Sequence, residues 1–371
     1  MTELAVLKER APGERRVAID PPTAAKLAAA GWRVRVESGA GEAAGFPDAA
    51  YPQAEIVVER AALLASAEVT VWVQPPEVAA IGQMKAGTMA LGLLFPHRHP
   101  ELVAALNANR ISLLALEAVP RITRAQAMDV LSSQATVAGY EAALLAADLS
   151  PRLFPMLTTA AGTLRPAKVV VIGAGVAGLQ AIATARRLGA QVEAYDIRAA
   201  AREQVESLGA RMIDTGVNAE GEGGYARDLT TEEKAQQAEA LARHLAKADA
   251  VIATAALPGR PAPKIVSRAM VEGMQPGSVI LDLAAESGGN CELTVPGEQV
   301  IHQYVTIAGP LNLASRAALH ASEMFARNVA NLLALLRDQE GKLLLDTADE
   351  IIQGCLMTHD GRTVHPSLAG R

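Results

Sequence analysis

The sequence predicts an α/β fold of two Rossmann-like, doubly wound domains, each built on a parallel sheet and joined by two long helices. Short β-branched or alternating segments recur between helical segments along most of the chain, and two long helical patterns interrupt the series. A glycine-rich turn directly after a buried strand marks the second series as the nucleotide-binding one.

The first series of elements begins at the N-terminus. Residues 4–7 are expected to form a strand, 22–30 a helix and 32–37 an alternating strand. Further strands of the series are expected at residues 69–73, 88–94 and 110–114. Strands that alternate with helices in this way favour a largely parallel sheet.

The two long helical patterns, 124–149 and 315–336, are expected to connect the domains. The first domain would then be discontinuous, with residues 1–130 plus 315–371, and the second would span 131–314. Strands of the second domain are expected at 168–172, 191–195, 250–254, 278–283 and 300–307. The segment 151–167, rich in Pro, Gly and Thr, is expected to lead into this sheet without regular structure.

Composition excludes several classes of protein. The 371 residues are 50% hydrophobic and 20% charged, which argues against disorder. The net charge of −6, without blocks of like charge, argues against nucleic acid or an anionic membrane surface as a partner. Cys291 and Cys355 are expected to be free thiols in a reducing compartment. We see neither a signal-peptide pattern nor a run of ~18 apolar residues, so we expect a soluble chain.

The glycine-rich turn predicts a dinucleotide site. Gly173 permits the tight turn, Gly175 removes a side chain that would block a pyrophosphate, and Gly178 lets the following helix pack closely. The N–H groups at the start of that helix would face the phosphates. Asp196 ends the next strand, where a carboxylate accepts from ribose hydroxyls and repels a 2′-phosphate, so NAD(H) is expected in preference to NADP(H). The alternative is a structural turn in an unrelated α/β domain.

A polar segment at the start of the first long helix is the second candidate site. Gln126, Asp129 and Ser132 are spaced three apart, which would place them on one helix face, and Arg121 lies just before the helix. Their amide, carboxylate, hydroxyl and cation match the polar groups of a nicotinamide riboside. The alternative is a capping box, in which Thr123 caps the helix and Gln126 reaches back to it, with Asp129 merely solvated.

The run PRITRAQAMDVLSSQATVAGY resembles the Arg-Gln-Asp loop of the NAD(H)-binding component of proton-translocating nicotinamide nucleotide transhydrogenases. Similar to the same family are LKERAPGERRVAIDP, VIGAGVAGLQAIATARRLGAQVEAYDIR, GGYARDL, DLAAESGGNCELTVPG and DGRTVHPSL, so that the resemblance covers essentially the whole chain. Alanine dehydrogenases share the architecture and the opening motif.

The resemblance implies a direct exchange of hydride between NADH on this chain and NADP⁺ on a partner subunit (Re/Si-specific transhydrogenase). It implies a membrane-spanning subunit that conducts protons, an NADP(H)-binding subunit, and a homodimer of the assembly. The chain itself would lie in the cytoplasm, peripheral to the inner membrane through its partners.

The resemblance also implies site residues. The nicotinamide end would be held by Arg121, Gln126, Asp129 and Ser132. The pyrophosphate and adenosine ribose would contact Gly173, Ala174, Gly175, Val176, Gly178, Asp196, Ile197 and Arg198. A mobile loop with Gly224 and Tyr225 would fold over the nucleotide, with Gln237 near the adenine and Ala256 in the loop after the fourth strand. Ala256 departs from the family, which often has a larger aliphatic residue before Pro258-Gly259.

Two other functions stay open at this point. An alanine dehydrogenase needs proton-transfer groups, but its catalytic lysine would fall where this chain has Gln74. His97 and His99 could match that family's histidine, although histidines flanked by prolines more often lie in surface loops. A non-catalytic NAD-sensing module would carry the same fold. The histidines show no metal-ligand spacing, so no metal site is expected.

Overall fold

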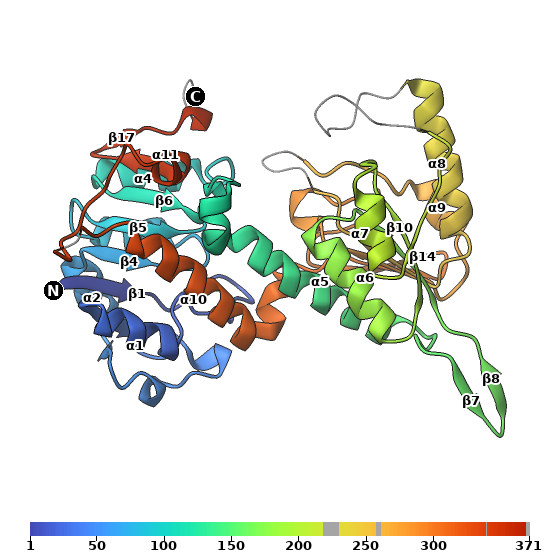
Figure 1. Ribbon diagram of the computed structural model, residues 1–371, viewed down its shortest axis with the longest axis horizontal. Helices are drawn as coiled ribbons and strands as arrows, with labels where there is room; N and C mark the ends of the chain where they lie inside the picture. The colour runs from blue at the N-terminus through green and yellow to red at the C-terminus, as the bar shows by residue number, and fades with distance from the viewer. Residues whose placement is uncertain (218–229, 257–260, 339, 369–371) are drawn as a thin grey trace. The chain divides into compact units, whose positions relative to one another are not determined.

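The computed structural model describes residues 1–217, 230–256, 261–338 and 340–368. The chain forms two compact units: unit 1 comprises residues 1–134 and 314–371, and unit 2 comprises residues 135–313. Each unit is an α/β structure in which helices pack on a mainly parallel sheet (Figure 1). This architecture confirms the predicted fold class.

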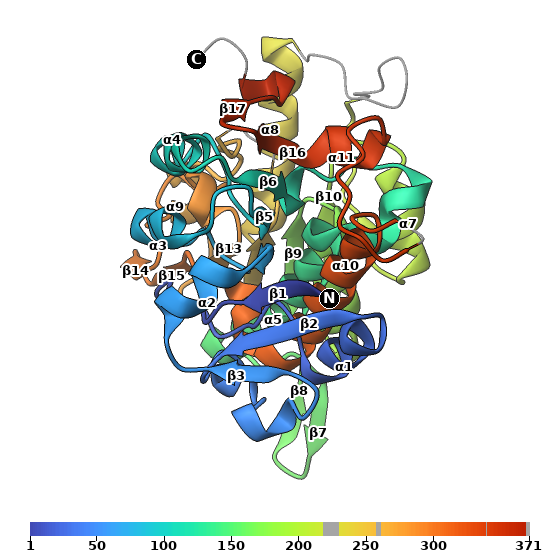
Figure 2. The same ribbon diagram turned by 90° about the vertical axis from the view of Figure 1, so that its left-hand side faces the viewer.

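Unit 1 is built on an eight-stranded sheet of order β17-β16-β6-β5-β4-β1-β2-β3. Strands β1 to β6 are parallel, whereas β16 and β17 run antiparallel to their neighbours, and Figure 2 shows the strands stacked across the unit. The strands are β1 (Thr2–Val6), β2 (Trp32–Glu37), β3 (Glu55–Val57), β4 (Val69–Val71), β5 (Met89–Gly92), β6 (Ser112–Ala115), β16 (Leu356–His359) and β17 (Arg362–Thr363). The helices are α1 (Pro21–Ala29), α2 (Arg60–Ser66), α3 (Val78–Gln83), α4 (Pro100–Ala108), α10 (Ala318–Ala334) and α11 (Glu350–Cys355).

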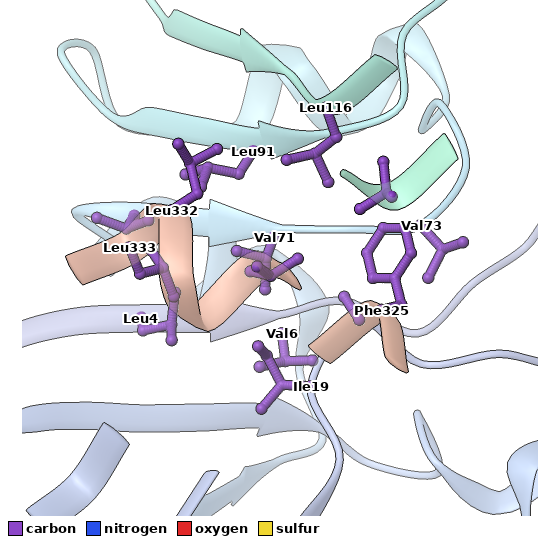
Figure 3. Packing of buried hydrophobic residues seen from close by; sticks show 14 of the residues in the cluster. Leu4, Val6, Ile19, Val71, Val73, Leu91, Leu116, Phe325, Leu332 and Leu333 are labelled. Carbon is purple, nitrogen blue, oxygen red and sulfur yellow. The ribbon is translucent and has the colours of Figure 1, made fainter. Parts of the chain in front are cut away.

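Both faces of this sheet are buried along its central strands β4, β5 and β6, whereas Arg33 of β2 is exposed. Leu4 and Val6 of β1 pack in one apolar cluster with Phe325 of α10 (Figure 3), whereas Ala5 and the following Leu7 belong to the cluster on the opposite face. Alternating residues of a strand point to opposite faces, and a parallel sheet needs helices on both. The near-continuous apolar strands of the sequence follow from this double burial.

Unit 2 is built on a seven-stranded sheet of order β11-β10-β9-β12-β13-β15-β14, parallel except for β14. The strands are β9 (Lys168–Ile172), β10 (Gln191–Tyr195), β11 (Arg211–Met212), β12 (Ala250–Ala253), β13 (Val279–Asp282), β14 (Gln299–His302) and β15 (Val305–Ala308). The helices are α6 (Val176–Arg187), α7 (Ala201–Ser207), α8 (Thr231–Leu245) and α9 (Arg268–Glu272). The strand order reverses between β9 and β12, and open α/β sheets bind ligands at the carboxyl ends of the strands beside such a reversal.

The expected helix over 124–149 is in fact two helices, which corrects the prediction. Residues Thr123–Met128 form a 3-10 helix, η4, and α5 then runs over Val130–Leu149. Between them Asp129 has ψ of 90°, outside the helical range, and its carboxylate accepts hydrogen bonds from the N–H and hydroxyl of Ser132 at 2.9 and 2.6 Å. A carboxylate that binds the third N–H of a helix caps its start, so α5 begins anew at this point.

The chain passes from unit 1 to unit 2 within α5. It returns at a short 3-10 helix, η7 (Leu313–Ala317), which leads directly into α10. The expected second long helix, 315–336, therefore consists of η7 followed by α10.

The last expected strand, 300–307, is also corrected, because it is a hairpin of β14 and β15. The turn residues Gln303 and Tyr304 both have positive φ, 44° and 66°. Two-residue hairpin turns of type I′ require positive φ at both central positions, and neither glutamine nor tyrosine is a residue type that predicts such a turn.

The Pro-, Gly- and Thr-rich segment before β9 also carries structure that the sequence did not predict. It contains a hairpin of β7 (Leu157–Thr159) and β8 (Gly162–Leu164). Both ends of this hairpin are anchored on Asp249, which accepts hydrogen bonds from Arg152 at 2.7 Å and from Arg165 at 2.7 and 3.0 Å.

Within the described ranges, no helix has both the length and the hydropathy to cross a membrane.

Candidate functional site

The glycine-rich turn lies at the carboxyl end of β9. Gly173 has φ of 90°, a conformation that side chains disfavour. A Cβ on Gly178 would lie 1.8 Å from the carbonyl oxygen of Gly173, so only glycine permits this approach of α6 to the turn. By contrast, a Cβ on Gly175 would meet no atom within 4 Å. The turn is therefore packed on its inner side and open at Gly175, as a cradle for a pyrophosphate must be.

Helix α6 begins beside this opening. Gly175 is its N-cap residue and offers no side-chain acceptor to the first turn. The N–H groups of that turn, which follow from Val176 onward, are the donors that bind phosphate at helix N-termini. The exposed side chain of Val176 and the buried Ala174 flank the opening.

Asp196, which follows β10, links the turn to the second strand. Its carboxylate accepts hydrogen bonds from the N–H of Ala174 at 2.7 Å, from the N–H of Arg198 at 2.8 Å, and from the Arg198 guanidinium at 2.9 and 2.8 Å. Burial raises the pKa of Asp196, but the hydrogen bonds from Arg198 and Ala174 lower it more, so that the pKa lies below its usual value. The carboxylate is thus held ionised against the glycine turn.

A hollow of about 350 Å³ opens beside Asp196. Its lining includes Asp196, Ile197, Arg198, Ile213 and Gln237. Gln237, on α8, is buried and accepts a hydrogen bond from the Tyr195 hydroxyl at 3.1 Å. The structure therefore gathers four of the nucleotide-site residues expected from sequence around one hollow, whose size suits a small ligand.

The other expected nucleotide-site residues are not part of this lining. Ala256 is exposed in the connection that follows β12. Gly224 and Tyr225, together with Pro258 and Gly259, lie outside the described residues.

The expected nicotinamide site belongs to unit 1, and its arrangement differs from the expectation. Because the helix restarts at Asp129, Gln126 and Ser132 do not share one continuous helix face. Arg121 and Gln126 are exposed, and within the described ranges neither side chain makes a hydrogen bond. Asp129 is partly engaged, because it caps α5 through Ser132.

The capping-box alternative is wrong in detail. The residue before η4 is Ile122, and no side-chain hydrogen bond caps that helix. Thr123 and Gln126 therefore do not form the expected box, while the real cap of this segment is Asp129.

Residues that sequence reasoning missed hold η4 in place. Asn328 and Asn331 of α10 both donate to the carbonyl oxygen of Ala127, at 2.8 and 3.0 Å. Arg124 makes a bidentate ion pair with Asp349 at 2.7 and 2.8 Å. The partners are some two hundred residues apart along the chain, so no local pattern could have revealed them.

A second polar cluster of unit 1 surrounds Gln74 at the carboxyl end of β4. Its amide donates to Glu14 at 3.1 Å, and Glu14 forms a buried ion pair with Arg16. The N–H groups of Val73 and Gln74 donate to Glu9 at 2.6 and 3.0 Å. Burial raises the pKa of Glu9 to about 8 although these hydrogen bonds lower it. Gln74 is thus a half-buried, hydrogen-bonded side chain and has no group that exchanges protons near neutral pH.

The remaining titratable candidates lie apart. His97 is exposed, and His99 contacts Glu101 at 3.2 Å. Cys291 and Cys355 are free and buried. Over the residues that the structure describes, no three His, Cys, Asp or Glu side chains gather in a metal-binding group.

Comparisons with known proteins agree with this geometry. Residues 5–138 match the description "Alanine dehydrogenase/PNT, N-terminal domain", and residues 142–366 match "Alanine dehydrogenase/PNT, C-terminal domain". A relative from Rhodospirillum rubrum, named as the first portion of NAD(P) transhydrogenase subunit alpha, is 45% identical over 100% of this chain and 99% of its own length.

Solved structures give the same picture. A transhydrogenase structure from Sinorhizobium meliloti matches with a TM-score of 0.86 and 41% identity, covering 98% of this chain and 99% of its own. An L-alanine dehydrogenase structure matches with a TM-score of 0.84 but 26% identity, covering 99% and 98%. The chain is therefore similar to both over its full length, and closer in sequence to the transhydrogenases.

The open side of the turn yields a prediction for Gly175→Ala. Gly175 has φ of −78°, which alanine adopts without strain, and the added methyl meets no protein atom, so the melting temperature should not change. Binding of NADH, measured by calorimetry, should weaken at least about tenfold, because the methyl occupies the space of the pyrophosphate. Gly178→Ala is the matched control, since its Cβ clashes with Gly173 and should lower stability itself. Undiminished NADH binding by Gly175→Ala would show that the turn is only structural.

Proposed function

This chain belongs to the alanine dehydrogenase/PNT family, and we propose that it is the NAD(H)-binding component of a proton-translocating transhydrogenase. In this proposal hydride passes directly between NADH on unit 2 and NADP⁺ on a partner subunit, with Re/Si specificity. A membrane-spanning subunit would couple the transfer to proton translocation. The chain would be peripheral to the cytoplasmic face of the inner membrane through these partners.

The observation that carries the proposal is the nucleotide site of unit 2. An open Gly175 beside α6 and an ionised Asp196 held on Ala174 fit the pyrophosphate and adenosine ribose of NAD(H). The whole chain matches relatives named transhydrogenase along nearly their entire length. Gln237, in the hollow beside Asp196, is proposed to lie near the adenine.

The chemistry accounts for what the site contains. Bound NADH would supply the hydride, and exchange between two nicotinamides releases no proton from a substrate, so no general acid or base is required. The chain's task is to orient the ring and exclude water. We propose that Arg121, Gln126 and Asp129, with Ser132, perform this orientation, because two exposed polar side chains lie beside a capped and rigid helix start.

The alanine dehydrogenase alternative is less well supported. That reaction moves protons on an imine and a carbonyl, and the lysine expected for it is Gln74 here. The Gln74 amide is already engaged by Glu14. The lower identity to alanine dehydrogenases agrees with this difference.

The first test concerns the adenosine ribose. We expect NADH to bind at least about fivefold more tightly than NADPH, because two like charges ~4 Å apart repel by about 1 kcal/mol even in bulk water. Replacing Asp196 by Ser should narrow this gap, since it removes the repulsion and leaves Arg198 without its partner. Calorimetric titration with both nucleotides measures the ratio. Equal affinities for the wild-type protein would contradict the role assigned to Asp196.

The second test concerns hydride transfer. Gln126→Ala should leave the melting temperature and most of the NADH affinity unchanged, because Gln126 is exposed. Transfer in the reconstituted assembly should fall about 100-fold, since displacing reacting atoms by ~1 Å costs that much. Single-turnover transfer and thermal melting on the same samples measure both effects.

Two variants serve as comparisons for Gln126→Ala. Gln83→Ala removes another exposed glutamine, at the end of α3, and should change neither quantity. Asp129→Ala should also lower stability, by about 0.5–2 kcal/mol, because Asp129 caps α5. A fully active Gln126→Ala assembly would overturn the proposed nicotinamide site.

The β7–β8 hairpin supports the proposal that the chain forms a homodimer. Met156, Leu157 and Leu164 are 65%, 42% and 54% exposed, although a two-stranded hairpin alone is marginally stable in water. Residues 153–164 carry no charge, so the same surface of two copies can meet about a two-fold axis without repulsion.

Sedimentation equilibrium tests this surface. The double variant Leu157→Ser and Leu164→Ser should weaken dimerisation at least about tenfold, because it removes two apolar side chains from the contact. Leu344→Ser, which changes a similarly exposed leucine of unit 1, should not. A double variant that dimerises like the wild type would place the interface elsewhere.

A further inference from the structure

We propose that Asn290 is a positioning residue for the dinucleotide, because it fixes the backbone of Ala255 against the glycine turn at Gly173. This inference rests on the proposed function, since it takes the turn to be the pyrophosphate site. Asn290 lies in the connection after β13, well apart in sequence from the turn that it would control.

The Asn290 side chain makes two hydrogen bonds to the backbone of Ala255. Its side chain is fully buried, its Oδ1 accepts from the N–H of Ala255 at 3.0 Å, and its Nδ2 donates to the carbonyl oxygen of Ala255 at 2.8 Å. The same Nδ2 donates to the carbonyl oxygen of Pro263 at 2.9 Å, further along the connection from β12 to α9. A carboxamide that holds both polar groups of one residue fixes its position and its orientation together.

The segment of Thr254 and Ala255 is in turn packed against the glycine turn. The Thr254 hydroxyl donates to the carbonyl oxygen of Gly173 at 2.9 Å. A Cβ on Gly173 would lie 2.9 Å from that hydroxyl oxygen and 3.0 Å from the nitrogen of Ala255. With no space between them, a shift of Ala255 must move the turn.

Asn290 itself is held by the end of β13. The buried carboxylate of Asp282 accepts from the N–H of Ala284 at 3.0 Å, the N–H of Cys291 at 2.9 Å and the hydroxyl of Thr294 at 2.6 Å. The connection is therefore rigid on both sides of Asn290. Hydrogen bonds thus hold Cys291, the neighbour of Asn290, on Asp282, hold Ala255 on Asn290, and hold Thr254, the neighbour of Ala255, on Gly173.

The hydrogen bonds of Asn290 lie outside the ladder that pairs β12 with β13, so they do not serve to hold these strands together. The ladder between β12 and β13 ends at the pair Ala253 and Asp282. The two hydrogen bonds between Asn290 and Ala255 lie beyond this pair, at the carboxyl edge of the sheet. They are beside the reversal of strand order at β9 and β12. Dinucleotides cross the sheet at this edge. The hydrogen bonds of Asn290 thus fix the backbone of Ala255 next to the turn over which the dinucleotide would lie.

The test is the ratio of two affinities of the full chain with Asn290→Ala, measured well below its melting temperature. NADH, followed by calorimetry, should bind about tenfold more weakly. Without the carboxamide, buried polar groups of the Ala255 and Pro263 backbone are unpaired and the turn is displaced. Adenosine, followed by NMR titration, has no pyrophosphate and should bind as it does to the wild type, because none of the residues that line the hollow beside Asp196 is hydrogen-bonded to Asn290.

Two variants control for stability. Ser278→Ala removes a buried hydrogen bond to the Ala248 carbonyl oxygen, 3.0 Å long, at the opposite end of β13, and should lower the melting temperature with no change in either affinity. Asn290→Asp keeps the acceptor for the Ala255 N–H but sets a carboxylate oxygen against the carbonyl oxygens of Ala255 and Pro263, so NADH affinity should fall at least as far as in Asn290→Ala. If Asn290→Ala does not fold, the same ratio is measured on Asn290→Asp.

The outcomes separate the two proposals. If the wild type binds NADH and the variant has the wild-type ratio of NADH to adenosine affinity, Asn290 is only structural and this inference fails alone. If the wild type binds no NADH, the proposed function fails, and this inference fails with it.

Discussion

Gly173 and Gly178 approach each other so closely that no side chain fits between them, and unit 2 depends on this contact. A Cβ on Gly178 would lie 1.8 Å from the Gly173 carbonyl oxygen. The contact brings the start of α6 down onto the end of β9, which leaves the N–H groups of the helix facing the opening at Gly175. Strand order then decides what lies around the opening: β10 supplies Asp196 on one side, and β12 supplies Thr254 on the other.

Asp196 has a structural role at this point and a proposed role in recognition. Its hydrogen bond to the Ala174 N–H ties the turn to β10, while Arg198 keeps the carboxylate ionised. The same charge that stabilises the turn would repel a 2′-phosphate. The proposed preference for NAD(H) therefore depends on the same carboxylate that ties the turn to β10.

A similar double use of one residue occurs in unit 1. Asp129 ends η4, caps α5 and stands beside the exposed Gln126 in the proposed nicotinamide site. The rigid start of a long helix limits the motion of side chains near it, and orientation is what hydride transfer between two rings requires. The side chains that fix η4 from outside, Asn328 and Asp349, belong to the C-terminal region of the chain.

The sequence by itself determined the fold class and the nucleotide turn, because both follow from short-range patterns. The expected strands at 168–172 and 191–195 coincide with β9 and β10, and the spacing of Gly173, Gly175 and Gly178 after a strand is typical of a tight turn into a helix. Asp196 and Gln237, which the family resemblance assigns to the nucleotide site, line the same hollow.

Tertiary structure decided the rest, since it depends on partners far apart in the chain or on backbone states that side chains do not announce. Spacing could not show that Asp129 interrupts a helix, because a carboxylate three residues before a serine fits a helix face and a helix cap equally well. The turn at Gln303 and Tyr304 adopts positive φ without a glycine. No sequence pattern pointed to Asn290, because its hydrogen bonds to Ala255 form only when the ends of β12 and β13 lie side by side.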